Sequence, residues 1–140
     1  MSISATVAQV ATNTANSTTP TATFAGNPTD GNLLVAMLQM NTTTAVITAA
    51  NGYTKLTEIS STDKGCLFFK VASADAGAQQ PCTLDASRAH AIAIVEWNAT
   101  NGWNTTTYWE GANADNDGTK TLTAAVDPTD SIAALVIGGG

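Results

Sequence analysis

Apolar and polar residues alternate with a period of two along most of this chain, and turn signals interrupt the alternation about every ten residues. Such alternation is typical of strands with one buried face, whereas an amphipathic helix repeats its apolar residues every three to four positions. The turn signals include Asp30-Gly31, Asn51-Gly52, Lys64-Gly65 and Asn101-Gly102. Many short strands at this spacing predict an all-β fold, an antiparallel and jelly-roll-like β-sandwich of roughly eight to eleven strands.

Three segments, residues 33–40, 66–72 and 91–97, are apolar at both alternating positions. Strands that are covered on both faces have this composition. A helix through residues 33–40 is the alternative, but Gly31 before it and the threonines after it favour a strand. We expect the core to be supplied by Leu33, Leu34, Val35, Ala36, Leu67, Phe69, Val71, Ile92, Ile94 and Val95.

The chain of 140 residues has the length of one domain. Residues 1–23 lack a strong apolar run, and we expect an N-terminal arm or edge strand that adds a strand to a neighbour. Residues 24–140 are expected to form the β-sandwich domain. The sequence "PTDGNLLVAM" at 28–37 is echoed by "PTDSIAALVI" at 128–137, as in a sandwich whose halves begin alike. The second run ends in three glycines, so it either closes the sheet or belongs to a longer parent.

Charge is scarce, and it limits the partners that we expect. Charged residues make up 11% of the chain, under half of the roughly 25% that soluble domains carry, and the net charge is −6. The cations are scattered, which disfavours binding to nucleic acid or to an anionic membrane. They are Lys55, Lys64, Lys70, Arg88 and Lys120.

The sequence shows no segment typical of export or of membrane insertion. Its N-terminus has neither a positive region nor an apolar region of signal-peptide type. The longest apolar run, residues 33–38, is far shorter than the ~18 residues of a membrane span. We therefore expect a chain that is soluble and not exported.

No pattern of catalytic residues emerges. The single histidine, His90, does not complete a zinc set with two distant cysteines, and we expect a strand-edge residue with a local hydrogen bond. The carboxylates best placed for an acid–base pair do not share one face of one strand, so each is expected to be solvated or to guard an edge. These are Glu58, Asp85, Glu96 and Glu110. The prediction is a protein without catalytic residues or cofactor.

Two cysteines, Cys66 and Cys82, leave two alternatives open. If their segments pair as a hairpin turning at Ala74, the thiols lie opposite one another, within reach of a disulfide. We favour two buried thiols in a reducing compartment, because no export signal is seen.

Residues 113–120, "NADNDGTK", carry part of a calcium-loop pattern. Asn113, Asp115 and Asp117 match its first three oxygen ligands, but Ala124 stands where the bidentate acid belongs. We expect a solvated hairpin tip and no tightly bound metal, with calcium as the only ion worth testing.

Four aromatic residues, Trp97, Trp103, Tyr108 and Trp109, lie within thirteen positions. They fill the core, form a subunit interface or stack on sugar rings, and the sequence leaves all three readings open. They are the candidates for an interface or a ligand site.

Four segments together resemble a β-sandwich domain that recurs in tailed-phage structural proteins and some bacterial surface proteins. They are "GNLLVAMLQ", "AANGYTKL", "LFFKVA" and "AIAIVEWNAT", in this order between residues 28 and 100. Tyr53 and Trp97 stand where that family usually has Trp and Tyr. The resemblance implies a jelly-roll-like sandwich and brings no catalytic residues.

The resemblance also implies a function. We expect a non-enzymatic virion structural protein, a capsid decoration or tail-associated protein, whose partners are other virion proteins or copies of itself in a homo-oligomer. Such a protein is made in the host cytoplasm, assembles into the virion and needs no export signal. The alternative is a carbohydrate- or surface-binding module of a larger extracellular or cell-surface protein.

Overall fold

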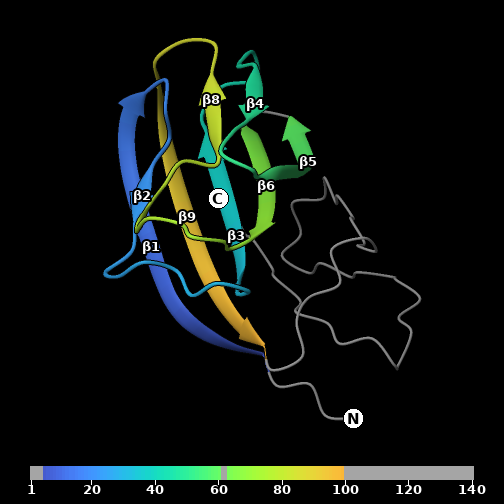
Figure 1. Ribbon diagram of the computed structural model, residues 1–140. Coiled ribbons are helices and arrows are strands. Elements are labelled where there is room, and N and C mark those ends of the chain that lie inside the picture. The colour runs from blue at the N-terminus through green and yellow to red at the C-terminus, as the bar shows by residue number, and fades with distance from the viewer. Residues whose placement is uncertain (1–4, 61–62, 100–140) are drawn as a thin grey trace, which may run out of the picture.

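The computed structural model describes residues 5–60 and 63–99, and this part of the chain consists of strands and loops without a helix (Figure 1). The predicted all-β, sandwich-like fold is confirmed. No helix in the described ranges is long and apolar enough to cross a membrane. The strands are β1 (Ala5–Ser17), β2 (Ala22–Thr23), β3 (Leu33–Met40), β4 (Ile47–Ala49), β5 (Thr54–Ser60), β6 (Lys64–Val71), β7 (Ala78–Gln79), β8 (Cys82–Leu84) and β9 (Arg88–Ala99).

One antiparallel sheet of five strands forms the larger layer, in the order β1-β9-β3-β6-β5. Its central strand β3 is the predicted strand at 33–40, and the alternative of a helix there is wrong. Val35 of β3 lies opposite Phe69 on one side and Val95 on the other. At one edge of the sheet, β1 pairs with β9 so that Ala5, the first described residue, lies opposite Ala99, the last.

Two short ribbons, β2-β7 and β4-β8, form the second layer, which Figure 1 shows on the near side of the broad sheet. Phe24, Ile47 and Leu84 from these ribbons and their flanking loops join one apolar cluster with Leu38 and Phe68 of the sheet. The hydrophobic core therefore lies between the two layers. We call the side of the five-stranded sheet that meets the ribbons its inner face.

Of three turns predicted from the sequence, two form and one does not. Gly31 and Gly52 adopt positive φ angles of 88° and 78°, which glycine tolerates best, and both predicted turns form. The turn predicted at Lys64-Gly65 is wrong. Both residues lie inside β6, where Gly65 faces Gln39 of β3 and Ile59 of β5.

The predicted core is correct for Ile92 and Ile94 of β9, whereas Val95 is buried on the other face of the sheet, and the prediction is wrong in register for β6. Leu34, Ala36, Ile92, Ile94 and Val95 are buried as expected. In β6 the buried residues are Cys66 and Phe68, whereas the predicted Leu67 and Phe69 are half-buried on the opposite face and Val71 is exposed. Leu33 and Val35 of β3 are half-buried too. The segment is apolar at both alternating positions, so its composition does not reveal which set faces the ribbons.

The predicted hairpin of the two cysteine segments does not form. Cys66 lies in β6, which pairs with β3 and β5, and Cys82 lies in β8, which pairs with β4. Both thiols are buried and free, as favoured from the sequence.

Candidate functional site

The side of the five-stranded sheet that points away from the ribbons, here called the outer face, carries no charged residue. The alternation of the strands and their register define its members. They are Val7, Val10, Thr12, Thr14 and Asn16 of β1; Ala89, Ala91, Ala93, Val95 and Trp97 of β9; Leu33, Val35, Met37 and Gln39 of β3; Gly65, Leu67, Phe69 and Val71 of β6; and Thr54, Thr57 and Ile59 of β5.

All the charged side chains of these five strands have the opposite parity and belong to the inner face or its rim. They are Lys55, Glu58, Lys64, Lys70, Arg88 and Glu96. Strands with a solvated face normally place polar and charged residues on it. This sheet places threonines, Asn16 and Gln39 on its outer face but no charged residue, and a face without charge has the composition of a surface that is covered.

The rim of the outer face is the most exposed apolar surface in the described part of the chain. Val7, Val10, Ile59 and Val71 are between 41% and 56% exposed. A β-bulge between Val7 and Gln9 shifts the register of β1, which brings both valines to this face. Among the described residues, the one other large hydrophobic residue with such exposure is Val46, at 61%, in the loop before β4. Contiguous apolar surface of this kind marks interaction sites.

Among the predicted interface residues, the structure describes Trp97 alone. It lies half-buried on the outer face, opposite Val7 of β1 and Leu33 of β3. Trp103, Tyr108 and Trp109 lie outside the described residues, as do the calcium candidates Asn113, Asp115 and Asp117. The readings of the aromatic cluster and of the calcium loop therefore stay predictions.

The two edges of the sheet differ in charge. β1 has no charged residue in its whole length, and among the described strands only β9 pairs with it. At the opposite edge, β5 carries Lys55 and Glu58. Charged side chains discourage the pairing of an edge with another strand, so β1 is the unguarded edge.

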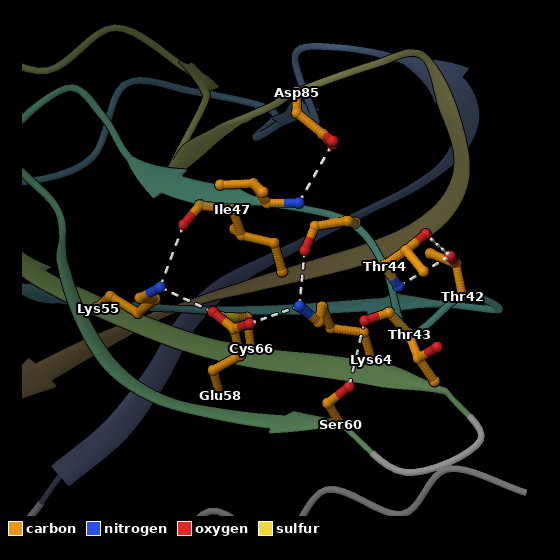
Figure 2. A network of polar contacts seen from close by, with 12 residues as sticks. Thr42, Thr43, Thr44, Ile47, Lys55, Glu58, Ser60, Lys64, Cys66 and Asp85 are labelled. Carbon is orange, nitrogen blue, oxygen red and sulfur yellow. Dashed lines mark hydrogen bonds and ion pairs between the residues drawn. The ribbon is translucent and has the colours of Figure 1, made fainter.

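A polar network joins β5 and β6 to the loop and strand around β4 (Figure 2). Glu58 accepts hydrogen bonds from Lys55 and Lys64, each at 2.7 Å. Lys55 also donates to the carbonyl of Ile47 at 3.1 Å, and Lys64 to that of Ala45 at 2.6 Å. The lysines thus tie the five-stranded sheet to the second layer, with one carboxylate balancing both charges.

The electrostatics of this network follow from its contacts. Burial favours a higher pKa for Glu58, but the hydrogen bonds from both lysines outweigh it, and the pKa is lowered. The hydrogen bond to Glu58 raises the pKa of Lys55. Both shifts favour the charged forms of Glu58 and Lys55, as an ion pair that stabilises the fold requires.

The cysteines beside the network are poor nucleophiles. Burial, together with the Glu58 carboxylate 3.9 Å from its sulfur, raises the pKa of Cys66 to about 12. Burial and the nearby Cys66 raise the pKa of Cys82 to about 12 as well. Because the thiolate is the reactive form, both thiols are inert at neutral pH.

Glu96 is buried, and the expectation of a solvated or edge-guarding acid is wrong for it. The residue is only 1% exposed. Its carboxylate accepts three hydrogen bonds, from Gln9 Nε2 at 2.5 Å, from the Thr29 backbone N–H at 2.8 Å and from Asn32 Nδ2 at 2.6 Å. Its partners come from distant parts of the sequence, so no local pattern reveals them. The carboxylate fastens the loop before β3 to β1 and β9.

The other candidate acids also have local partners. Asp85 accepts from Arg88 at 3.2 Å and from the Val46 backbone at 3.1 Å, and the hydrogen bond from Arg88 contributes most to lowering its pKa. Glu110 lies outside the described residues. Among the described residues, Glu58, Asp85 and Glu96 each have their own hydrogen-bond partners, and none of these contacts joins two of the acids.

His90 makes the predicted local hydrogen bond but is buried, with 5% exposed. Its Nδ1 lies 2.9 Å from the Arg88 carbonyl, which only accepts, so Nδ1 carries the proton. Its Nε2 is buried without a hydrogen-bond partner beside a hollow of about 360 Å³ that Asp63 and Gln39 also line. In the described ranges no three His, Cys, Asp or Glu side chains gather as metal ligands.

A second hollow, of about 390 Å³, is lined mainly by polar groups. Lys70 lies on its wall, paired with Asp75 at 2.5 Å and 4.7 Å from the centre of the Tyr53 ring. Gln79 accepts a hydrogen bond from the Tyr53 hydroxyl at 3.0 Å. Thr21, Asn51 and Gln80 complete the polar lining.

Comparison with models of protein families, with curated proteins and with solved structures gave no match. The described residues thus combine a charge-free outer face, an unguarded edge and two small polar hollows. Among these, the outer face is the largest feature, and its chemistry suits contact with protein.

Proposed function

We propose that this protein is a non-enzymatic structural component of a virion, a capsid decoration or tail-associated protein, that works through protein–protein contacts. The observation that carries the proposal is the outer face of the five-stranded sheet, which is mostly apolar and free of charge while its rim is exposed. Interface centres are depleted of charge and enriched in aromatic residues. A surface of this composition serves assembly better than it serves a solitary monomer.

The resemblance of four sequence segments to phage structural domains supports the virion as the place of assembly. The all-β, sandwich-like fold is compatible with that class of protein. The inert thiols and individually paired acids of the described part fit a protein without turnover. The unguarded edge at β1 offers a second place where a neighbour's strand can add.

Mass spectrometry of intact virus particles, purified by density gradient from the source of this sequence, tests the proposal. We expect peptides of this chain in the particle band, at a stoichiometry comparable to that of the capsid or tail proteins. Peptides found only in the soluble fraction, with particles of the same source free of the chain, would refute it.

A carbohydrate-binding module is the second candidate, and the hollow of about 390 Å³ favours it. Amide and hydroxyl groups from Asn51, Gln80 and Thr21 line this hollow, and such groups recognise sugar hydroxyls. A glycan array with the whole chain and with an Asn51→Ala variant tests this candidate. Sugar binding that the variant loses would favour the module over the virion protein.

A further inference from the structure

The distribution of charge on the protein bears on what covers the outer face, and it favours a second copy of the chain. The protein carries a net charge of −6, so two copies repel wherever their charged surfaces meet. The outer face holds no carboxylate and no cation, whereas the charged side chains of the same strands lie on the inner face or its rim. Two acidic copies therefore meet at this face without placing like charges in contact.

The size of the face suits a dimer. Five strands about 4.8 Å apart and about seven residues long, at about 3.4 Å each, present roughly 550 Å² of flat area. Two such faces bury roughly 1,100 Å² of flat area, and side-chain relief adds to this, which reaches the lower range of specific interfaces. A monomer's largest apolar patch is usually about 300–600 Å² and is often functional, and the outer face lies at the upper end of that range.

The sequence of residues 100–140 is less suited to covering the outer face than a second copy of the sheet is. Residues 100–140 lie outside the described part, and their longest charge-free stretches, 100–109 and 131–140, have ten residues each. Each of these stretches is long enough for one strand, so together they provide two strands, and the face is five strands wide. A partner sheet of the same width covers it completely.

We infer that two copies of the chain pack their outer faces together, sheet on sheet, around a two-fold axis. The inference rests on the proposed function and names the first partner of its contact surface. A two-fold axis makes the contact self-complementary, because both copies use the same residues. Val10 and Val71 of each copy therefore lie on the rim of the one shared contact. Aligned sheets about 10 Å apart let the outer side chains interdigitate as in a β-sandwich core.

Three lysine substitutions in the whole chain test the inference. Val10 and Val71 lie on the outer face and are 56% and 41% exposed, whereas Val46, off the face, is 61% exposed. Light scattering coupled to sizing should give twice the chain mass for the wild-type protein at micromolar concentration. Val10→Lys and Val71→Lys should raise the dimer dissociation constant at least tenfold, because a charge must lose its water in the contact. Val46→Lys should leave it unchanged.

A monomeric wild-type chain, or equal effects of all three substitutions, would overturn the inference. So would a fall in melting temperature for Val10→Lys and Val71→Lys without change of mass, since the chain itself then covers the face. Should these variants not fold, peroxide oxidation of the wild-type chain gives a second measure. Met37, on the outer face, should be oxidised more slowly as concentration rises, while the rate for the buried Met40 stays constant. A concentration-independent rate at Met37 would overturn it too.

The outcomes also separate this inference from the proposed function. A dimer broken by the face variants, with the chain absent from virus particles, keeps the inference and refutes the virion role. A monomer that is nonetheless found in purified particles does the opposite, and the partner at the face is then another virion protein.

Discussion

Phe68 and Phe69 are neighbours in the same strand, yet they belong to opposite faces of the sheet. Phe68 is fully buried between the two layers, whereas Phe69 is half-buried on the outer face. The inner face combines apolar residues with ion pairs and a buried carboxylate whose partners are all supplied by the chain. The outer face combines apolar residues with threonines and no charge. The fold itself therefore completes the inner face, whereas the outer face is suited to completion by a partner.

The largest effect that separates the two faces should come from the two phenylalanines. Phe68→Ala should lower the free energy of unfolding by about 3–5 kcal/mol, since it empties a fully buried site. Phe69→Ala should cost less than half as much, because part of its surface is already in contact with water. Reversible urea unfolding of the whole chain at low concentration measures both. Equal losses would mean that the outer face is as completely covered as the inner one.

The assignment of the two phenylalanines also shows where sequence reasoning reached its limit. Alternation and turn signals predicted the all-β fold, the strand at 33–40 and the turns at Gly31 and Gly52. The residues of β6 are apolar at both parities, and a shift of one residue exchanges all inner and outer side chains. Only the position of the ribbons decides between them, and that is a tertiary property.

The polar features were harder still to predict. Lys64-Gly65 has the composition of a turn, but Lys64 is buried in β6 because Glu58 and the Ala45 carbonyl satisfy its ammonium group. Glu96 finds its three donors 64 to 87 positions away in the sequence. The outer face could have been recognised once the strand pairing was known, since its lack of charge follows directly from parity and register.

Glu96 provides the second prediction, because it tests how far the inner face depends on buried polar groups. Glu96→Ala leaves the Thr29 backbone and the amides of Gln9 and Asn32 without their acceptor. Unsatisfied buried donors cost about 1–3 kcal/mol each, so a loss of about 3 kcal/mol in total is expected after partial relaxation. Urea unfolding measures the loss.

Glu96→Gln is the matched control for that prediction. It keeps one carbonyl oxygen for Thr29 and Asn32, and the Gln9 amide can rotate to face the new amide group. A loss of about 1 kcal/mol is expected. If the glutamine variant is as unstable as the alanine variant, both oxygens of the Glu96 side chain, and not one alone, are needed as acceptors to hold the loop.

The third prediction uses pH. Burial raises the pKa of Cys66 and of Cys82 to about 12 in the folded protein, whereas in the unfolded chain each thiol has its ordinary pKa of 9.0. Between these values the unfolded chain has released protons that the folded chain still holds, so stability falls as pH rises. Each thiol contributes a slope of about 1.4 kcal/mol per pH unit, which gives about 2–3 kcal/mol for both at pH 10.

Urea unfolding between pH 7 and pH 10.5, for the wild-type chain and for a Cys66→Ala, Cys82→Ala variant, measures this slope. The variant is less stable at neutral pH but should lose less stability on going to pH 10. Parallel curves for the two proteins would show that the thiols are not buried as the structure places them.

The smallest effect in this series concerns the two lysines that share Glu58. The side chain of Lys64 is 9% exposed and that of Lys55 is 36% exposed, although both lie 2.7 Å from the same carboxylate. Lys64→Met removes a buried charge-assisted contact to Glu58 and the hydrogen bond to the Ala45 carbonyl, and about 1–2 kcal/mol should be lost. Lys55→Met removes a pair at the rim, where water already weakens the attraction, and should cost under about 0.5 kcal/mol.

Thermal unfolding at low and at 1 M salt measures the loss of stability in each of the two variants. Salt should reduce the difference in stability between Lys55→Met and the wild-type chain, because screening acts on exposed pairs. The difference in stability between Lys64→Met and the wild-type chain should stay nearly constant. An equal response of both variants to salt would mean that the Lys64 end of the network is open to water, and that the inner face is less completely closed by the fold than its contacts indicate.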